Sequence, residues 1–242
     1  MQALLVIIPC YNEATNLEAL YQELQAVSIR GREIKPLFIN DGSQDHSQAI
    51  LEEKGLPHLH LCNNLGIGGA SQAGYRYALE NGFKEVVRID GDGQHPPQAI
   101  ARLLETMERE KAQVVIGSRF VEKQGFQSSL SRRLGIRWIS NWVYRLSGVR
   151  VLDITSGFSL IRGEAIKLAA QHYPDSFPEP ESVVLFARQG LKIAEAPVKM
   201  RPRQAGRSSI NTQVSMLYMF KVLLGVFFIY LKFKRHGSDH TA

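Results

Sequence analysis

The stretch "ALLVIIPCYNEATNLEALYQELQAV", residues 3–27, joins a continuous apolar run to a segment with helical spacing. The run over residues 3–9 contains no polar side chain and has the length of a β-strand. Apolar residues then recur every three or four positions, at Leu17, Leu20, Leu24 and Val27, as they do on one face of a helix. A buried strand followed by such a helix begins a βαβ unit and predicts a parallel sheet.

The same alternation continues along the chain. Strand-like apolar runs lie at 35–40, 58–62, 85–90 and 112–118, and helices are expected at about 44–54, 69–81 and 97–111. Further on, the pattern predicts strands over 154–161 and 191–198, and helices over 164–171 and 182–190. The predicted fold class is therefore α/β, with a mostly parallel sheet covered by helices on both faces.

The bulk composition is that of a globular protein with 242 residues, 44% of them hydrophobic and 21% charged. This length fits one large domain, or one domain with an appendage. Two cysteines, Cys10 and Cys62, argue for a reducing compartment, and the short apolar start lacks the features of a signal peptide. We therefore expect a cytosolic N-terminus. The net charge of +6 favours anionic partners such as nucleic acid, phosphorylated substrates or a membrane surface.

Polar clusters follow the first five predicted strands. They read "PCYNE" (9–13), "NDGSQD" (40–45), "NNLGIGGA" (63–70), "DGDGQ" (90–94) and "GSR" (117–119). In open α/β sheets, ligands bind beyond the carboxyl ends of the strands. One site built from all five clusters is therefore expected at a single edge of the sheet, which we call the rim.

The most informative cluster is the turn in "VVRIDGDGQHPP", residues 86–97, which follows a largely apolar strand. Asp90 and Asp92 are one residue apart in a glycine-rich turn, so both carboxylates can face one point. A hard divalent cation shared with substrate phosphates fits this arrangement, although an isolated Asp-Gly turn is as often only solvated. His95 is close enough to contact the same ligand, or is simply a loop residue.

Two other clusters suggest nucleotide contacts. Asp41 ends the second strand and is placed to accept hydrogen bonds from a base or ribose, whereas Asp45 is explained by capping the next helix. The glycines Gly66, Gly68 and Gly69 do not form the GxGxxG pattern of dinucleotide-binding proteins. Gly68 remains a candidate for close backbone approach to a ligand or to a neighbouring strand.

Taken in order, these clusters resemble the inverting glycosyltransferases of family 2, which have the GT-A fold. "IPCYNE", "NDGSQD", "NLGIGGA", "DGDGQ" and "GSR" carry the resemblance, and "DITSGFSLI" and "RQAGRSS" extend it over nearly all of residues 4–210. Within the family, the chain is similar to the polyprenyl-phosphate sugar transferases. The resemblance implies a catalytic domain over 1–210, and the apolar and basic composition of residues 211–242 predicts a membrane-associating segment.

The resemblance also implies roles for individual residues. Asp90 and Asp92 would be the DxD pair, with Asp92 ligating Mg²⁺ or Mn²⁺. Asn40 stands where such chains commonly have aspartate, which leaves the assignment of Asp41 unchanged. The remaining donor-binding candidates are Pro9, Tyr11, Glu13 and Asp41 at the nucleoside, Gln94 beside the metal, and Arg203 with Ser208 closing over the diphosphate.

The chemistry of the acceptor decides which further groups are needed. A lipid phosphate is largely deprotonated at neutral pH, so it needs cationic groups to hold it and no strong base. Arg119 and Arg132 are the candidates for that clamp, with Arg133 ranked below them. A sugar hydroxyl would instead need a carboxylate base, for which Glu181 ranks ahead of Glu179. Either glutamate could also position the donor sugar or begin a helix.

The C-terminal segment is apolar and is followed by basic residues. Over residues 214–231 only Ser215 and Lys221 are clearly polar. We favour a helix lying in the membrane interface, with a single span and a buried core helix as alternatives. A second basic helix over about 127–147, which carries Trp138, could lie in the same interface. Such weak anchoring suggests a small integral-membrane partner, which similar transferases use.

The leading hypothesis is transfer of a sugar, from UDP-GlcNAc or UDP-Glc, to undecaprenyl or another polyprenyl phosphate. The reaction would take place at the cytoplasmic face of the membrane and serve cell-wall or surface polysaccharide synthesis. Two alternatives stay open, namely extension of a lipid-linked glycan at a hydroxyl, and a non-catalytic nucleotide-sugar sensor or membrane adaptor. Nucleic-acid binding is not expected, because the basic residues flank apolar helices and form no broad stripe with stacking aromatics.

Overall fold

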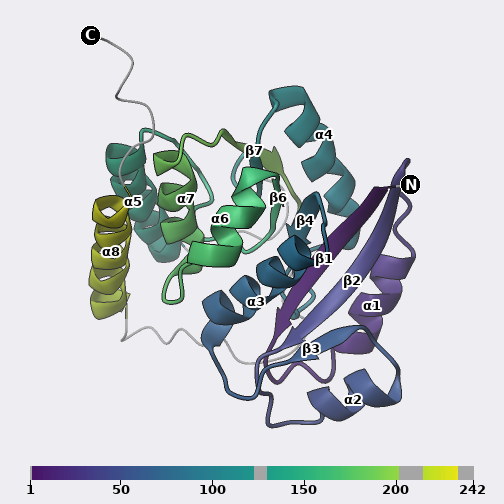
Figure 1. Ribbon diagram of the computed structural model, residues 1–242. Helices are drawn as coiled ribbons and strands as arrows, with labels where there is room; N and C mark the ends of the chain where they lie inside the picture. Colours follow the sequence, from purple (N-terminus) through teal and green to yellow (C-terminus); the bar gives the residue numbers. More distant parts are fainter. Residues whose placement is uncertain (1, 123–129, 202–214, 234–242) are drawn as a thin grey trace.

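The computed structural model describes residues 2–122, 130–201 and 215–233, with the backbone alone for 130–134 and 215–218. Seven strands form one sheet in the order β3-β2-β1-β4-β6-β5-β7 (Figure 1). Their bounds are β1 Gln2–Cys10, β2 Arg32–Asn40, β3 His58–His60, β4 Glu85–Arg88, β5 Val114–Ser118, β6 Ser159–Arg162 and β7 Ile193–Pro197. All neighbours pair in parallel except β6, which is antiparallel to both β4 and β5.

Helices cover both faces of this sheet (Figure 1). One face packs mainly against α1 and α4, and the other against α3, α6 and α7, with α5 and α8 outside α7. The helices are α1 Leu17–Gln25, α2 Ser47–Glu53, α3 Gly66–Glu80, α4 Ile100–Glu110, α5 Leu130–Ser147, α6 Glu164–His172, α7 Pro178–Arg188 and α8 Ser215–Lys232, and a 3₁₀ turn, η1 Pro97–Ala99, precedes α4. The α/β prediction is confirmed.

The antiparallel strand β6 has a direct consequence for the rim. Its neighbours β4 and β5 end at the rim, so β6 begins there. The segment that leads into β6 therefore lies beside the ends of both strands, and Ser156 Oγ donates to the carbonyl of Gly117 at 2.6 Å. Residues from "DITSGF", far along the chain, thus join the five clusters predicted for this edge.

Several element boundaries differ from the sequence-based expectations: β6 begins five residues later, at Ser159, and α3 three residues earlier, at Gly66. β2 begins at Arg32, three residues before the apolar run, because it pairs with β1 along its whole length. α7 begins at Pro178, four residues early, with proline in its first turn where no amide donor is required. Both Glu179 and Glu181 consequently lie in the first turn of a helix.

α8 packs against α5 and α7 through one side and leaves other side chains exposed. Val222 and Val226 are buried, and Trp142 Nε1 of α5 donates to the carbonyl of Leu223 at 3.2 Å. Phe220, Phe228 and Leu231 are more than half exposed. Among the helices of the described residues, none combines the length and apolar character of a membrane span. The predicted boundary at 210/211 lies outside the described residues.

Candidate active site

The acidic turn after β4 is fixed by hydrogen bonds within its own loop. The backbone N–H of Asp90 donates to His95 Nδ1 at 3.0 Å, and the N–H of Gln94 donates to Asp92 Oδ1 at 3.1 Å. His95 is buried and stacks on Phe158 at 5.2 Å between ring centroids. Burial lowers its pKa, so the ring is neutral and can accept from Asp90. His95 therefore has a structural role that holds the turn.

Asp90 and Asp92 differ in their surroundings. Asp92 is buried, whereas the side chain of Asp90 is 32% exposed. A Cβ atom added to Gly157, just before β6, would lie 2.6 and 2.7 Å from the carboxylate oxygens of Asp90. Glycine is therefore required at this position for Asp90 to occupy its place.

Arg88, the last residue of β4, lies beneath the acidic turn and was not recognised from the sequence. Its Nη2 donates to Glu179 Oε1 at 2.8 Å and to Asp90 Oδ1 at 3.3 Å. The signal was present, because a charged residue in the buried strand "VVRID" requires a partner. Because its neighbours in the strand are apolar, the pattern predicts a strand of the hydrophobic core and does not single out Arg88.

The two candidate glutamates are separated by the structure. Glu179 shares the guanidinium of Arg88 with Asp90, so it lies at the rim. Glu181, ranked first as a base, faces α8 instead, and a Cβ atom added to Gly225 would lie 2.1 Å from its Oε1. Burial, reinforced by Asp175 and Glu179, raises the pKa of Glu181 to about 7. Glu179 is therefore the glutamate beside the acidic turn, and the ranking of the two as a base stays a prediction.

The other predicted donor contacts come together at the ends of β1 and β2. Asp41 is buried, and its Oδ1 accepts the N–H of Leu65 at 2.7 Å, which brings the glycine-rich segment against β2. Burial raises the pKa of Asp41, while the hydrogen bonds from Leu65 and Gly66 oppose the rise. Asn40 donates to Gln48 Oε1 at 2.6 Å, which gives a reason for an amide at this position.

The loop after β1 is joined to the loop after β2 by side chains. Pro9 lies within β1, one residue before its end, and Tyr11 is exposed. The N–H of Glu13 donates to Ser47 Oγ at 3.1 Å, and Asp45 accepts the N–H of Ser47, the first residue of α2, at 2.9 Å. The N-cap position of α2 is occupied by His46 and not by Asp45. The rim therefore places Tyr11 and Glu13 next to the segment that carries Asp41.

Gly68 is explained by packing. A Cβ atom there would lie 2.2 Å from the carbonyl oxygen of Pro174 and 2.6 Å from the backbone of Asp175. The backbone that approaches this glycine closely belongs to the loop between α6 and α7, and not to a strand as expected. Its assignment as a donor-binding residue has no support from these contacts.

Arg119, expected to hold the acceptor phosphate, is paired with a buried carboxylate. Its Nε and Nη2 donate to Asp153 Oδ2 and Oδ1 at 2.7 and 2.6 Å, and Nη2 also donates to Thr155. This pairing raises the pKa of Arg119 and fixes the segment before β6. The pair gives Arg119 a structural function, and its role as a clamp stays a prediction.

Several candidates lie outside the described residues. They are Arg203 and Ser208, together with the side chains of Arg132 and Arg133. The described chain before residue 202 does reach the rim, because the N–H of Arg201 donates to the carbonyl of Gln94 at 2.9 Å. The position of Gln94 beside the acidic turn agrees with its predicted place.

Comparison with known proteins agrees with this arrangement. The sequence profile of glycosyl transferase family 2 matches residues 5–167. The chain belongs to glycosyl transferase family 2. It is 30% identical over 231 residues to polyprenol monophosphomannose synthase of Mycolicibacterium smegmatis, covering 91% of this chain and 86% of the relative. It is also 32% identical over 216 residues to undecaprenyl-phosphate mannosyltransferase of Micrococcus luteus, covering 86% and 87%.

A solved structure shows the same fold. Glucosyl-3-phosphoglycerate synthase from Mycobacterium tuberculosis, in complex with Mn²⁺, UDP-glucose and phosphoglyceric acid, superposes with a TM-score of 0.66. The match covers 95% of this chain and 80% of that one, at 18% identity. This family 2 glycosyltransferase therefore has the predicted GT-A fold.

The acidic turn of this glycosyltransferase fits a divalent cation only if a substrate supplies further ligands. Within the described part of the chain, no group of three or more His, Cys, Asp or Glu side chains is arranged to bind a metal ion. Asp90 and Asp92 offer two carboxylates at most. Mg²⁺ is commonly bound in this way, through one or two carboxylates and the phosphates of a substrate. The residues present therefore fit Mg²⁺ or Mn²⁺ together with a diphosphate.

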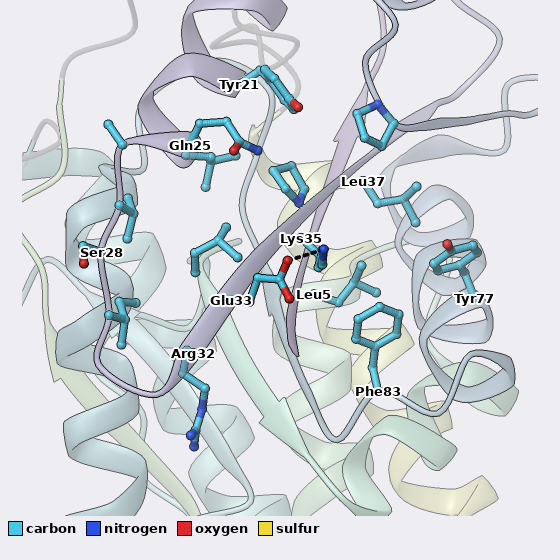
Figure 2. Close-up of a pocket in the computed structure, with 17 residues that line it drawn as sticks. Leu5, Tyr21, Gln25, Ser28, Arg32, Glu33, Lys35, Leu37, Tyr77 and Phe83 are labelled. Carbon is cyan, nitrogen blue, oxygen red and sulfur yellow. Dashed lines mark ion pairs between the residues drawn. The ribbon is translucent and has the colours of Figure 1, made fainter. Parts of the chain in front are cut away.

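A large hollow of about 680 Å³ lies away from the rim (Figure 2). It is lined by the first half of β2, the end of α1 and the side chains of Tyr77 and Phe83. Its charged residues already form pairs, Arg32 with Glu85 and Lys35 with Glu33. None of the rim clusters contributes to it, so we do not assign it to the transfer site.

Proposed function

We propose that this glycosyltransferase moves a sugar from a nucleoside-diphosphate sugar to a polyprenyl phosphate, with inversion and with a divalent cation. The observation that carries the proposal is the acidic pair Asp90 and Asp92 at the end of β4, in a chain similar to two mannosyl transferases named for polyprenyl acceptors. The solved relative with Mn²⁺ and UDP-glucose supports the cation and the nucleotide donor.

The chemistry follows from the charges at the rim. As the bond between the sugar and the diphosphate breaks, negative charge develops on the departing nucleotide. A cation bound by Asp92, with Asp90 beside it, would neutralise that charge where it forms. Asp41, Tyr11 and Glu13 line the adjacent part of the rim and would hold the nucleoside. Arg203 and Ser208 would close over the diphosphate.

A phosphate acceptor suits the carboxylates of this rim better than a hydroxyl acceptor. A phosphate oxygen attacks the anomeric carbon without giving up a proton, because it is already largely ionised at neutral pH. A hydroxyl acceptor would require a base. Glu179 is ion-paired with Arg88, and Glu181 packs against α8. These positions support the phosphate acceptor, for which Arg119, Arg132 and Arg133 remain the proposed clamp.

A lipid acceptor places the enzyme at a membrane surface, and we propose that α5 and α8 form the contact. Trp138 of α5 is 68% exposed, and Phe228 of α8 is 62% exposed. Lys221 and Lys232 are exposed on α8, where they would meet anionic headgroups. We place this surface at the cytoplasmic face. Because such anchoring is weak, we propose that a small integral-membrane partner also holds the enzyme at the membrane.

The donor sugar is the finer part of the proposal. We propose UDP-GlcNAc or UDP-Glc as donor and undecaprenyl phosphate as acceptor, in cell-wall or surface polysaccharide synthesis. The two similar curated proteins are named for mannose, so a mannose donor is the competing outcome.

The deciding experiment is direct. Purified protein is incubated with Mn²⁺, a short-chain polyprenyl phosphate and a panel of nucleotide sugars, and the lipid product is weighed by mass spectrometry. A product heavier by one sugar supports the proposal and names the donor. Parallel reactions contain a lipid-linked glycan instead of the lipid phosphate, and a product on the glycan with none on the lipid phosphate would replace the proposal with the hydroxyl reaction. Nucleotide-sugar binding without any product would identify a non-catalytic sensor.

A further inference from the structure

Arg88 is a charged side chain in the middle of the sheet. It is 1% exposed and heads the largest fully buried side chains of the described residues. Removing a guanidinium from water costs several kcal/mol unless charged partners compensate for the loss. A buried ion pair is often no more stabilising than apolar residues of similar volume. Stability therefore gives no sufficient reason for an arginine at this position.

The partners of Arg88 come from three segments, namely α7, the loop before it and the turn after β4. Nη2 donates to Glu179 in the first turn of α7 and to Asp90 in the turn after β4. Nη1 donates to the hydroxyl of Tyr173 at 2.8 Å, in the loop before α7. The planar guanidinium is suited to hold several acceptors in fixed directions, which a lysine ammonium is not. Arg88 thus joins α7 to the acidic turn.

Both carboxylates contact Arg88 from the side of the rim. Their side chains are 32% and 22% exposed for Asp90 and Glu179, whereas Arg88 is enclosed. The cation therefore lies beneath two acids whose other edges are accessible. Asp90, Asp92 and Glu179 would repel one another at close range, and one buried positive charge offsets part of that repulsion. Among the described residues Nε of Arg88 has no hydrogen-bond partner, so Nη2 alone holds both carboxylates while Nη1 holds the hydroxyl of Tyr173.

We propose that Arg88 is a positioning residue that sets Glu179 and Asp90 at the two sides of one donor subsite. Through Asp90 it orients the acid next to the diphosphate, and through Glu179 it aims an acceptor of hydrogen bonds at the hydroxyls of the donor sugar. Glu179 would then contribute to the choice of sugar, and Arg88 would act through it. This inference rests on the proposed function for the identity of the donor.

The test is donor binding measured by calorimetry with Mn²⁺ and without acceptor, alongside steady-state transfer. Arg88→Lys keeps the charge but loses the planar fork. We expect it to weaken binding of the nucleotide sugar about tenfold or more and binding of free UDP to a smaller extent, because UDP loses only the orientation of Asp90 whereas the nucleotide sugar also loses its contact with Glu179. Glu179→Gln should show the same selective loss. The double variant should bind no more weakly than Arg88→Lys alone, because both substitutions disrupt the same contact between Arg88 and Glu179.

A matched control is available on the same sheet. Arg32 forms an ion pair with Glu85, the first residue of β4, at 2.7 Å and far from the rim. Arg32→Lys makes the same chemical change and should leave binding of both nucleotides unaltered. If Arg88→Lys does not fold, Glu179→Gln decides by itself.

Two results would overturn the role of Arg88. The first is wild-type binding of the nucleotide sugar in Glu179→Gln, and the second is an equal loss for UDP and the nucleotide sugar in Arg88→Lys. Absence of lipid product with the wild-type protein would count against the proposed function alone, since the binding measurements need no acceptor.

Discussion

Asp92 is the single residue on which the proposed chemistry most depends. It is buried in the acidic turn, and its Oδ1 already accepts the N–H of Gln94. We predict that Asp92→Ala lowers kcat about 100-fold or more, because charge on the departing nucleotide is no longer neutralised. EDTA should abolish transfer in the wild type, and Mn²⁺ should restore it. Glu164→Gln, an exposed carboxylate on α6, serves as control, and full activity of Asp92→Ala would refute the metal assignment.

Gly157 offers a second test at the same scale. A methyl group there would come within 2.7 Å of both carboxylate oxygens of Asp90, so Asp90 must move away from its present position. We predict that Gly157→Ala reduces kcat at least tenfold with a small change in the midpoint of thermal unfolding, because the displaced atoms belong to a side chain.

The control for this substitution is Gly135→Ala in α5. A Cβ atom there makes only ordinary contact with Met219, at 3.6 Å from its sulfur. This variant should keep full activity. Unchanged kcat in Gly157→Ala would show that the position of Asp90 is not critical.

At the scale of elements, α7 and α8 are coupled through Glu181 and Gly225. The carboxyl of Glu181 borders a hollow of about 380 Å³ that also includes His172, Asp175 and Lys232. The absence of a side chain at Gly225 lets α8 approach this carboxyl closely. Arg188 at the end of α7 adds a second contact by donating to the carbonyl of Phe233 at 2.7 Å.

This contact predicts a pH dependence of stability. The pKa of Glu181 rises from 4.5 to about 7 in the folded protein, chiefly because burial disfavours the charged form. Between these values the folded chain keeps a proton that the unfolded chain has lost, so the free energy of unfolding falls as pH rises. The contribution is complete below about 4.5 and is lost as pH passes about 7.

We therefore expect Glu181→Gln to be less sensitive than the wild type to a change from pH 5 to pH 8 in urea unfolding. The comparison isolates Glu181, because all other titrating groups are common to both proteins. Parallel pH profiles would show that the Glu181 carboxyl is ionised in the folded state throughout.

At the scale of the whole molecule, α5 and α8 lie together on one side of the catalytic sheet (Figure 1). If this side meets the membrane, exposed aromatics should contribute to binding. Transferring one large apolar side chain out of water is worth about 1.5–3 kcal/mol, so Phe228→Ser should weaken partition into anionic vesicles about tenfold or more. Sedimentation with vesicles of mixed neutral and anionic lipid measures the effect.

Leu152→Ser provides the control for membrane binding. Leu152 is exposed in the segment before β6, outside α5 and α8, and its loss should leave vesicle binding unchanged. Equal binding of the wild type and Phe228→Ser would place the membrane contact elsewhere. Lipid-phosphate transfer in detergent should persist in Phe228→Ser, because the rim is intact.

The alternation of strands and helices, and with it the rim, could be predicted from the sequence alone. Hydrophobic periodicity is a local property, so it predicts β1, α1 and β4 without knowledge of their neighbours. The carboxyl ends of parallel strands must lie at one edge of the sheet, so Asp41, Asp90 and Asp92 are predicted to lie at the same edge. The family also followed from the order of the clusters, because each of them is a short local motif.

The pairing of charged residues that are distant in the sequence is set by tertiary packing. Arg88 and Glu179 are 91 positions apart, and Arg119 pairs with Asp153 across 34. No local pattern specifies such pairs, since they depend on how β6 and α7 pack against β4 and β5. For the same reason Glu181 was ranked above Glu179. Their helix was predicted, but the direction of each side chain is set by contact with Arg88 on one side and with α8 on the other.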